Sequence, residues 1–190
     1  MLIGDSISFA IESEITKAYV NPGLRALGLF VVHIDRRRFG VHSPEASLLA
    51  NSFDAVSERI RCRGTHTAPF SDEPSGHELA DAVVRALYCE TERGRKFFDL
   101  EEREFVDLIH SRHLLWVPDG DQAFDDGSHI LQFDLDDRVR LVAFKREEAE
   151  LYEPQTLVDA WLPSETFYGA LISWSSAFEL EWRRSARVSG

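Results

Sequence analysis

Polar and apolar positions alternate along residues 5–15, a period of two that is typical of a half-buried strand. The tripeptide Asn21-Pro22-Gly23 has the composition of a turn. An apolar segment from Leu27 to Ile34 follows and ends at three arginines. These features predict an antiparallel hairpin at the start of the chain.

The next part of the chain predicts short helices separated by loops. Apolar residues within 47–61 fit the end of a strand followed by a helix, whereas the Pro- and Gly-containing residues 63–77 fit a loop. Helical spacing returns from about His77 to Cys89. Asp99, with Glu102 three residues later, has the spacing of a capping box and predicts the start of a further helix.

Two strand-like segments, Ser128 to Leu135 and Arg138 to Phe144, are separated only by Asp136 and Asp137, which predicts a tight hairpin. Residues 156–162 fit another strand. Ser164 is placed to cap a final helix. The apolar stripe of this helix consists of Phe167, Leu171, Trp174, Phe178 and Trp182.

Strands and helices are mixed without the regular alternation of a doubly wound sheet. We therefore expect an α+β fold in a single domain over residues 1–184, with a largely antiparallel sheet and a long amphipathic C-terminal helix. Residues 185–190 are expected to fray.

Composition narrows the possible partners. The 190 residues include 21 Lys and Arg against 33 Asp and Glu, so the formal net charge is −12. Such a chain repels phosphate backbones, which argues against general nucleic-acid binding and favours a basic protein partner.

Several features predict a cytoplasmic protein. Cys62 and Cys89 lack the spacing of a disulfide framework and are expected to be reduced thiols. The N-terminus has no basic segment followed by an apolar core, as a secretion signal would. The longest apolar run, Leu27 to Val32, is too short to cross a membrane.

One pattern in the sequence could belong to a catalytic site. Gly4-Asp5-Ser6 resembles the nucleophile block of an esterase family, and Asp126 precedes His129 by three residues, as in the matching acid–base motif. A small hydrolase using Ser6 and His129 is therefore an alternative function. However, the residues after Ser6 continue a strand pattern instead of opening a helix, so we predict that the protein is not an enzyme.

Metal-binding patterns are weak in the sequence. The acidic residues 119–127 do not fit the ligand positions of an EF-hand loop. Among the histidines only His110 and His113 are close in sequence, and neither cysteine has a partner at ligand spacing. The sequence therefore predicts no metal site and no cofactor.

Several blocks together resemble family forty-two of the bacterial polymorphic-toxin immunity proteins. They are Ile3-Gly4-Asp5 with Phe9-Ala10-Ile11, residues 123–128 with 131–133 and 139–144, and the C-terminal pairs 161–162, 167–168, 178–179 and 181–182. The resemblance implies a cytoplasmic protein that binds and neutralises the C-terminal domain of one cognate toxin, as in contact-dependent inhibition. An interaction module without a toxin partner is the remaining alternative.

If the toxin is a basic nuclease, the densest acidic segments are the expected contact surface. Seven aspartates lie between residues 119 and 137, and four glutamates follow between 147 and 153. Asp125 and Asp126 are assigned to turn structure. The predicted toxin-binding residues are Asp134, Asp136, Asp137, Glu147, Glu148 and Glu150.

Overall fold

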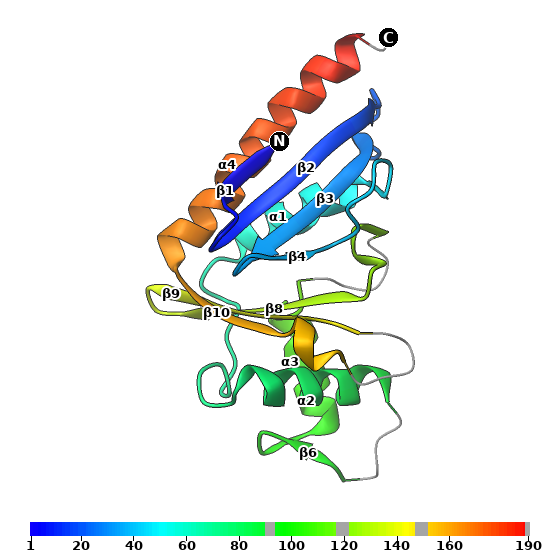
Figure 1. The fold of residues 1–190 in the computed structure, drawn as a ribbon. Helices are drawn as coiled ribbons and strands as arrows, with labels where there is room; N and C mark the ends of the chain where they lie inside the picture. Colours follow the sequence, from blue (N-terminus) through cyan, green and yellow to red (C-terminus); the bar gives the residue numbers. More distant parts are fainter. Residues whose placement is uncertain (90–93, 117–121, 147–151, 189–190) are drawn as a thin grey trace.

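The computed structural model describes residues 1–89, 94–116, 122–146 and 152–188, with side chains as far as Ala186. This part of the chain contains antiparallel sheets and four α-helices, the last of them long (Figure 1). The predicted α+β class is therefore confirmed.

The strands form a five-stranded sheet in the order β1-β2-β3-β4, with β5 beside β3, a three-stranded sheet β10-β9-β8 and a hairpin β6-β7. The strands are β1 (Leu2–Asp5), β2 (Phe9–Ala18), β3 (Ala26–Ile34), β4 (Arg37–Phe39), β5 (Ser47–Leu48), β6 (Lys96–Phe97), β7 (Leu100–Glu101), β8 (Ser128–Leu135), β9 (Arg138–Lys145) and β10 (Val158–Pro163). The helices are α1 (Leu49–Arg61), α2 (Gly76–Tyr88), α3 (Glu102–Ser111) and α4 (Ser164–Val188), with 3-10 turns at Gln122–Phe124 and Pro154–Thr156.

The N-terminal hairpin is confirmed as the antiparallel pair β2–β3, but its first strand begins at Phe9. The residues before Phe9 form the turn between β1 and β2, in which Asp5 accepts hydrogen bonds from the Ile7 amide and the Ser8 hydroxyl. Gly4, in β1 just before this turn, allows β1 to pair closely with β2, because its φ of 106° is unfavourable for other residues and a Cβ would lie 2.4 Å from the Phe9 carbonyl oxygen.

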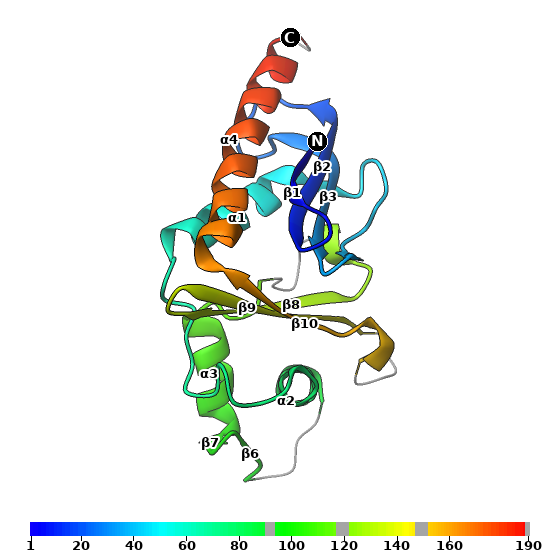
Figure 2. The same ribbon diagram turned by 60° about the vertical axis from the view of Figure 1, so that its left-hand side comes forward.

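The three-stranded sheet lies across the middle of the molecule and is covered on both faces (Figure 2). Ile130 packs into a core with α1, α4 and the N-terminal sheet. Its neighbour Leu131 packs on the other face with residues of α2 and α3. Because alternate side chains of β8 enter two different cores, the strand is buried along most of its length.

The apolar stripe of α4 is confirmed as core. Trp174 and Phe178 are fully buried, and their rings stack with centroids 5.1 Å apart. One detail differs from the expectation. Ser164 is the first residue of α4 instead of its cap, because the helix follows β10 directly. The helix is assigned as far as Val188, and fraying of residues 185–190 stays a prediction.

The capping box predicted at Asp99 and Glu102 is wrong. Phe98 and Asp99 have positive φ values and form the turn of the β6–β7 hairpin, which the sequence pattern did not reveal. The helix therefore begins two residues later than Asp99 would require, and the Glu101 amide donates to the Glu104 carboxylate at 3.2 Å.

None of the helices in the described ranges combines the length and the hydropathy needed to cross a membrane.

Candidate functional site

Asp136 and Asp137 form the exposed two-residue turn between β8 and β9, so the predicted tight hairpin is confirmed. Asp136 has a φ of 52°, which aspartate tolerates better than most residues. The Asp137 carbonyl oxygen accepts a hydrogen bond of 2.7 Å from the Ser164 amide. This bond attaches the turn to the first residue of α4. The backbone that carries the two exposed carboxylates is therefore held in place.

Asp134 does not fit the predicted role of direct toxin contact, because its side chain points inward and the residue is only 7% exposed. Its Oδ2 accepts a hydrogen bond of 2.6 Å from the Gly64 amide, and its Oδ1 accepts one of 2.8 Å from the Tyr168 hydroxyl. Residues 134 and 136 would share one face of a continuous strand. They differ because β8 ends at Leu135, so Asp134 lies within the buried strand and Asp136 lies in the turn that follows it.

The buried carboxylate belongs to a polar network between β8, α1 and α4. Gln132 donates to both Asp134 and Tyr168 and accepts a hydrogen bond of 3.0 Å from Arg59. Burial raises the pKa of Tyr168, and the Asp134 charge adds to that effect. Burial lowers the pKa of Arg59, while Tyr168 and Asp134 oppose this shift. The network therefore stabilises two buried charges of opposite sign.

Three of the predicted contact residues, Glu147, Glu148 and Glu150, lie outside the described residues. The structure adds an aromatic residue that the charge pattern did not indicate. Trp161 on β10 is 39% exposed, and the guanidinium of Arg138 lies 4.8 Å from the centre of its ring. Arg138 directly follows the acidic turn, so Trp161 and the turn belong to one surface.

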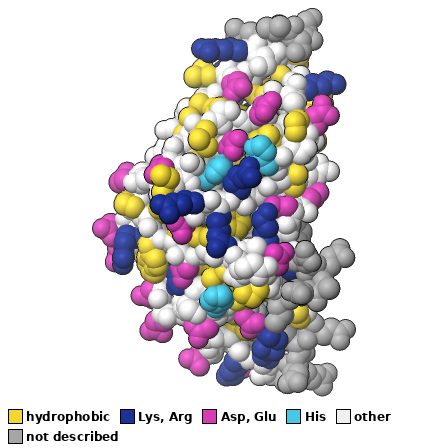
Figure 3. Space-filling view, viewed as in Figure 1, with side chains coloured by type: hydrophobic (Ala, Val, Ile, Leu, Met, Phe, Trp, Pro, Cys, Tyr) yellow, Lys and Arg dark blue, Asp and Glu magenta, His cyan; other side chains and the backbone are white. Residues whose placement is uncertain are grey.

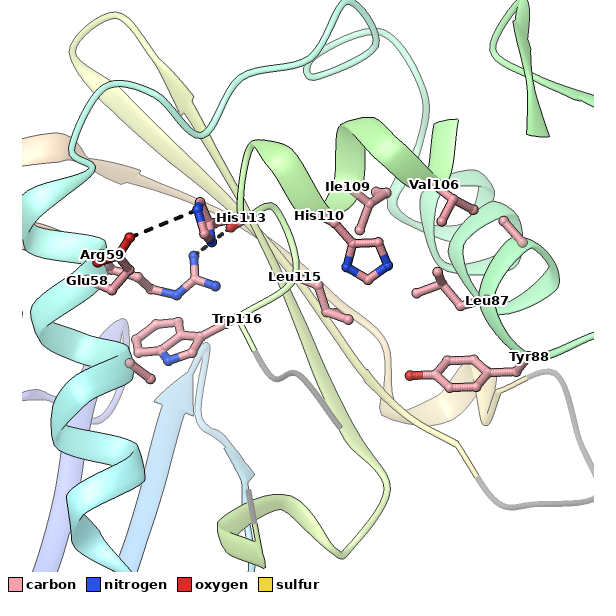
Figure 4. A pocket seen from close by; sticks show the side chains of 12 residues that line it. Glu58, Arg59, Leu87, Tyr88, Val106, Ile109, His110, His113, Leu115 and Trp116 are labelled. Atoms are coloured by element: carbon pink, nitrogen blue, oxygen red, sulfur yellow. Dashed lines mark hydrogen bonds and ion pairs between the residues drawn. The ribbon is translucent and has the colours of Figure 1, made fainter. Parts of the chain in front are cut away.

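A cavity of about 580 Å³ lies between α1, α2 and α3 (Figure 4). Trp116, Leu115 and Tyr88 contribute apolar and aromatic surface, while His110 and His113 contribute imidazoles. The two histidines that are close in sequence thus line the same cavity, but they do not face a common point, because His113 is directed toward Glu58 on α1 (Figure 4).

The carboxylate of Glu58 is at the centre of a small polar cluster at the cavity rim. Its Oε1 lies 3.3 Å from Cys62 Sγ and 3.9 Å from His113 Nε2, and the carboxylate also pairs with Arg61. The Arg61 and Cys62 hydrogen bonds lower the pKa of Glu58 to about 2. Burial and the bond to Glu58 raise the pKa of the Cys62 thiol.

The residues of the hydrolase alternative do not form a catalytic pair. Ser6 lies in the turn between two antiparallel strands, where no helix follows. His129 Nδ1 contacts the Gly127 carbonyl oxygen at 2.8 Å and Nε2 contacts the Tyr88 hydroxyl at 3.1 Å. Asp126 accepts from the Ser128 amide and from Lys145, which confirms its assignment to turn structure.

A further titratable cluster joins β2 and β3. Glu12 Oε2 lies 2.8 Å from His33 Nε2, and Oε1 lies 3.2 Å from His42 Nε2. Burial raises the pKa of Glu12, but the hydrogen bonds with both histidines outweigh it, so the pKa is lower than its usual value of 4.5.

We expect Glu12→Gln to lower the free energy of unfolding by about 0.5 to 1 kcal/mol at pH 7. A lowered carboxylate pKa contributes stability above the unfolded-state value, and this contribution is lost as the pH falls through the folded-state value. The difference between wild type and variant in urea unfolding should therefore shrink as the pH falls below 4.5, the usual pKa of a glutamate carboxyl. The control is Glu14→Gln, an exposed position on the same strand. An equal effect at both positions would contradict the assignment.

Comparison with known proteins gives a family match and a solved structure of similar fold. The family model described as Immunity protein 42 matches residues 1–177. No curated protein matches the chain significantly. Among solved structures, one described as CdiI from Burkholderia dolosa AUO158 is similar in fold, with a TM-score of 0.60 and 15% sequence identity. The similarity covers 93% of this chain and 99% of that one.

Proposed function

The chain belongs to the immunity protein 42 family, and we propose that it binds and neutralises one cognate toxin domain in the cytoplasm of the cell that makes it. The family match over residues 1–177 is the observation that carries this proposal. Inhibition occurs by binding, without a catalytic step. The partner is the C-terminal domain of the toxin, as in contact-dependent inhibition.

The toxin in this proposal is a basic nuclease, because a nuclease needs Lys and Arg to hold phosphate and is attracted to an acidic inhibitor. The net charge of −12 provides that attraction. Figure 3 shows acidic side chains, with basic ones among them, along the left-hand edge of the molecule, where the β8–β9 turn lies in Figure 1, and further basic side chains across the middle of that face.

The proposed contact surface is the turn of Asp136 and Asp137 together with Trp161. It combines exposed carboxylates, which guide association, with an exposed aromatic ring of the kind that carries binding energy at interfaces. Glu147, Glu148 and Glu150 follow the other end of β9 in the chain and are proposed as separate toxin contacts. Asp134 supports the hairpin from inside. Occupation of the toxin's active site or substrate face by this surface would block access of the substrate.

The partner is tested by co-purification with the C-terminal domain of the large protein encoded immediately upstream, at two salt concentrations. Tight binding that weakens with salt, together with rescue of growth in cells that express the toxin domain, is the expected result. Tight binding that is insensitive to salt would retain the immunity function and contradict the electrostatic surface. Failure of the upstream domain to bind would contradict the proposed function.

The contact surface is tested by charge reversal at one position. We expect Asp136→Lys to reduce the association rate with the toxin domain about ten-fold at low salt, because it replaces attraction by repulsion. The matched control is Asp35→Lys, since Asp35 is also an exposed aspartate at positive φ, with a value of 45°, in the turn between β3 and β4. Association rates are measured by surface plasmon resonance.

The control separates a local effect from that of net charge, because both variants change the charge by the same amount and place lysine in a similar backbone conformation. A smaller effect of Asp35→Lys is the expected outcome. Equal reductions would show that only the overall charge matters, and no reduction with Asp136→Lys would remove the turn from the interface.

A further inference from the structure

Three side chains of different chemistry meet where the end of α1 approaches the second residue after α3. Ligand atoms of Glu58, Cys62 and His113 all lie within 4.8 Å of one another. Glu58 and Cys62 are four residues apart, so the helix places them on one face, one turn apart. His113 reaches them from a segment about fifty positions later in the chain.

Two of the three separations are close to those of ligands around one metal ion, and the third, between Cys62 and His113, is within 4.8 Å. Zinc binds cysteine sulfur at about 2.3 Å and histidine nitrogen or carboxylate oxygen at about 2.0 to 2.2 Å. A tetrahedral arrangement with these bond lengths separates the ligand atoms by about 3.4 to 3.6 Å. Cys62 Sγ lies 3.3 Å and His113 Nε2 lies 3.9 Å from Glu58 Oε1. Shifts of about half an ångström at these two contacts would bring them to such distances.

The position of His113 is fixed by the interior of the protein. Its carbonyl oxygen accepts a hydrogen bond of 3.1 Å from Arg59, which is itself 4% exposed and anchored to Gln132. His113 has a φ of 49°, a left-handed conformation usual for glycine or asparagine after a helix. The buried arginine of α1 thus holds the backbone of His113 beside the two ligands that α1 carries.

The donor set selects the kind of ion. Calcium and magnesium prefer oxygen ligands, whereas thiolate and imidazole favour zinc and related transition metals. The Glu58 and His113 side chains are 37% and 51% exposed, so an ion can reach them from solvent. Arg61 now pairs with Glu58, but its side chain is 70% exposed and can turn away at small cost.

We propose that Glu58, Cys62 and His113 form a zinc-binding site at the rim of the cavity between α1 and α3. Three protein ligands leave the fourth tetrahedral position to solvent. The site draws its ligands from two helix ends, so a bound ion would link α1 to α3. This proposal does not depend on toxin binding and is tested on the protein alone.

The test is a zinc titration of the reduced full-length protein against a chromogenic chelator. We expect one zinc ion per chain and at least about a ten-fold loss of affinity in Cys62→Ser and in His113→Ala. Cobalt in place of zinc should give the charge-transfer absorption of a thiolate ligand, absent in Cys62→Ser. The matched controls are Cys89→Ser, at the other cysteine, and His110→Ala, at the other histidine of the cavity; both should bind as wild type.

Arg61→Ala provides a test that misfolding cannot imitate. Because Arg61 competes with the ion for the Glu58 carboxylate, its removal should tighten zinc binding. Weaker binding in Arg61→Ala would contradict the role of Glu58. Wild-type affinity in Cys62→Ser, equal losses in the two cysteine variants, or no zinc binding by wild type at micromolar concentration would overturn the proposed site.

Discussion

Replacement of Asp134 with alanine is expected to lower the free energy of unfolding by about 3 to 5 kcal/mol. The variant leaves the buried Arg59 guanidinium without the carboxylate that compensates it, and Gly64, Gln132 and Tyr168 lose an acceptor. Buried donors without an acceptor cost more than exposed ones, because water cannot replace the lost bond.

The measurement is urea unfolding followed by far-ultraviolet circular dichroism at neutral pH. Asp137→Ala is the matched control, since it removes the same side chain at an exposed position without a positive φ, and it should change stability by less than about 0.5 kcal/mol. Equal effects of the two variants would contradict the internal role of Asp134.

This pair of variants also separates stability from binding. If the proposed toxin surface is correct, Asp134→Ala reduces binding only in proportion to the unfolded fraction, whereas Asp137→Ala slows association of a fully folded protein. The comparison requires binding to be measured well below the unfolding temperature of the weaker variant.

Replacement of Trp174 with alanine is expected to lower the free energy of unfolding by about 3 to 5 kcal/mol. Its ring is fully buried between α4 and the N-terminal sheet, with its centroid 5.0 Å from that of Phe30. Its indole nitrogen donates a hydrogen bond of 3.0 Å to the Ser13 hydroxyl on β2. The variant therefore creates a cavity and leaves the buried Ser13 without its donor.

The same unfolding measurement distinguishes this position from the outer face of the helix. Ile172→Ala is the control, because Ile172 is 48% exposed two residues earlier on α4, and a loss of less than about 1 kcal/mol is expected. Trp174→Phe should recover part of the packing but not the hydrogen bond with Ser13. A loss in Trp174→Ala no larger than that in Ile172→Ala would show that α4 does not depend on this contact.

Local patterns predicted elements whose own residues determine them. The hairpin around Asp136 and Asp137 needs a tight turn between two apolar segments, and both features are adjacent in the chain. The stripe of α4 follows from helical spacing. The β6–β7 hairpin was missed because it is only two residue pairs long, and a nearby Asp–Glu spacing suggested a helix cap instead.

The sequence by itself determined the fold class, the central hairpin, the long C-terminal helix, the acidity and the resemblance to an immunity family. Only the tertiary structure decided which acidic residues face solvent, because Asp134 is buried by α4 and by the segment at Gly64, which are far away in the chain. The same holds for the cluster of Glu58, Cys62 and His113. Sequence spacing reports neighbours on one element, whereas burial and ligand geometry depend on contacts between elements, and these form only when the whole core assembles.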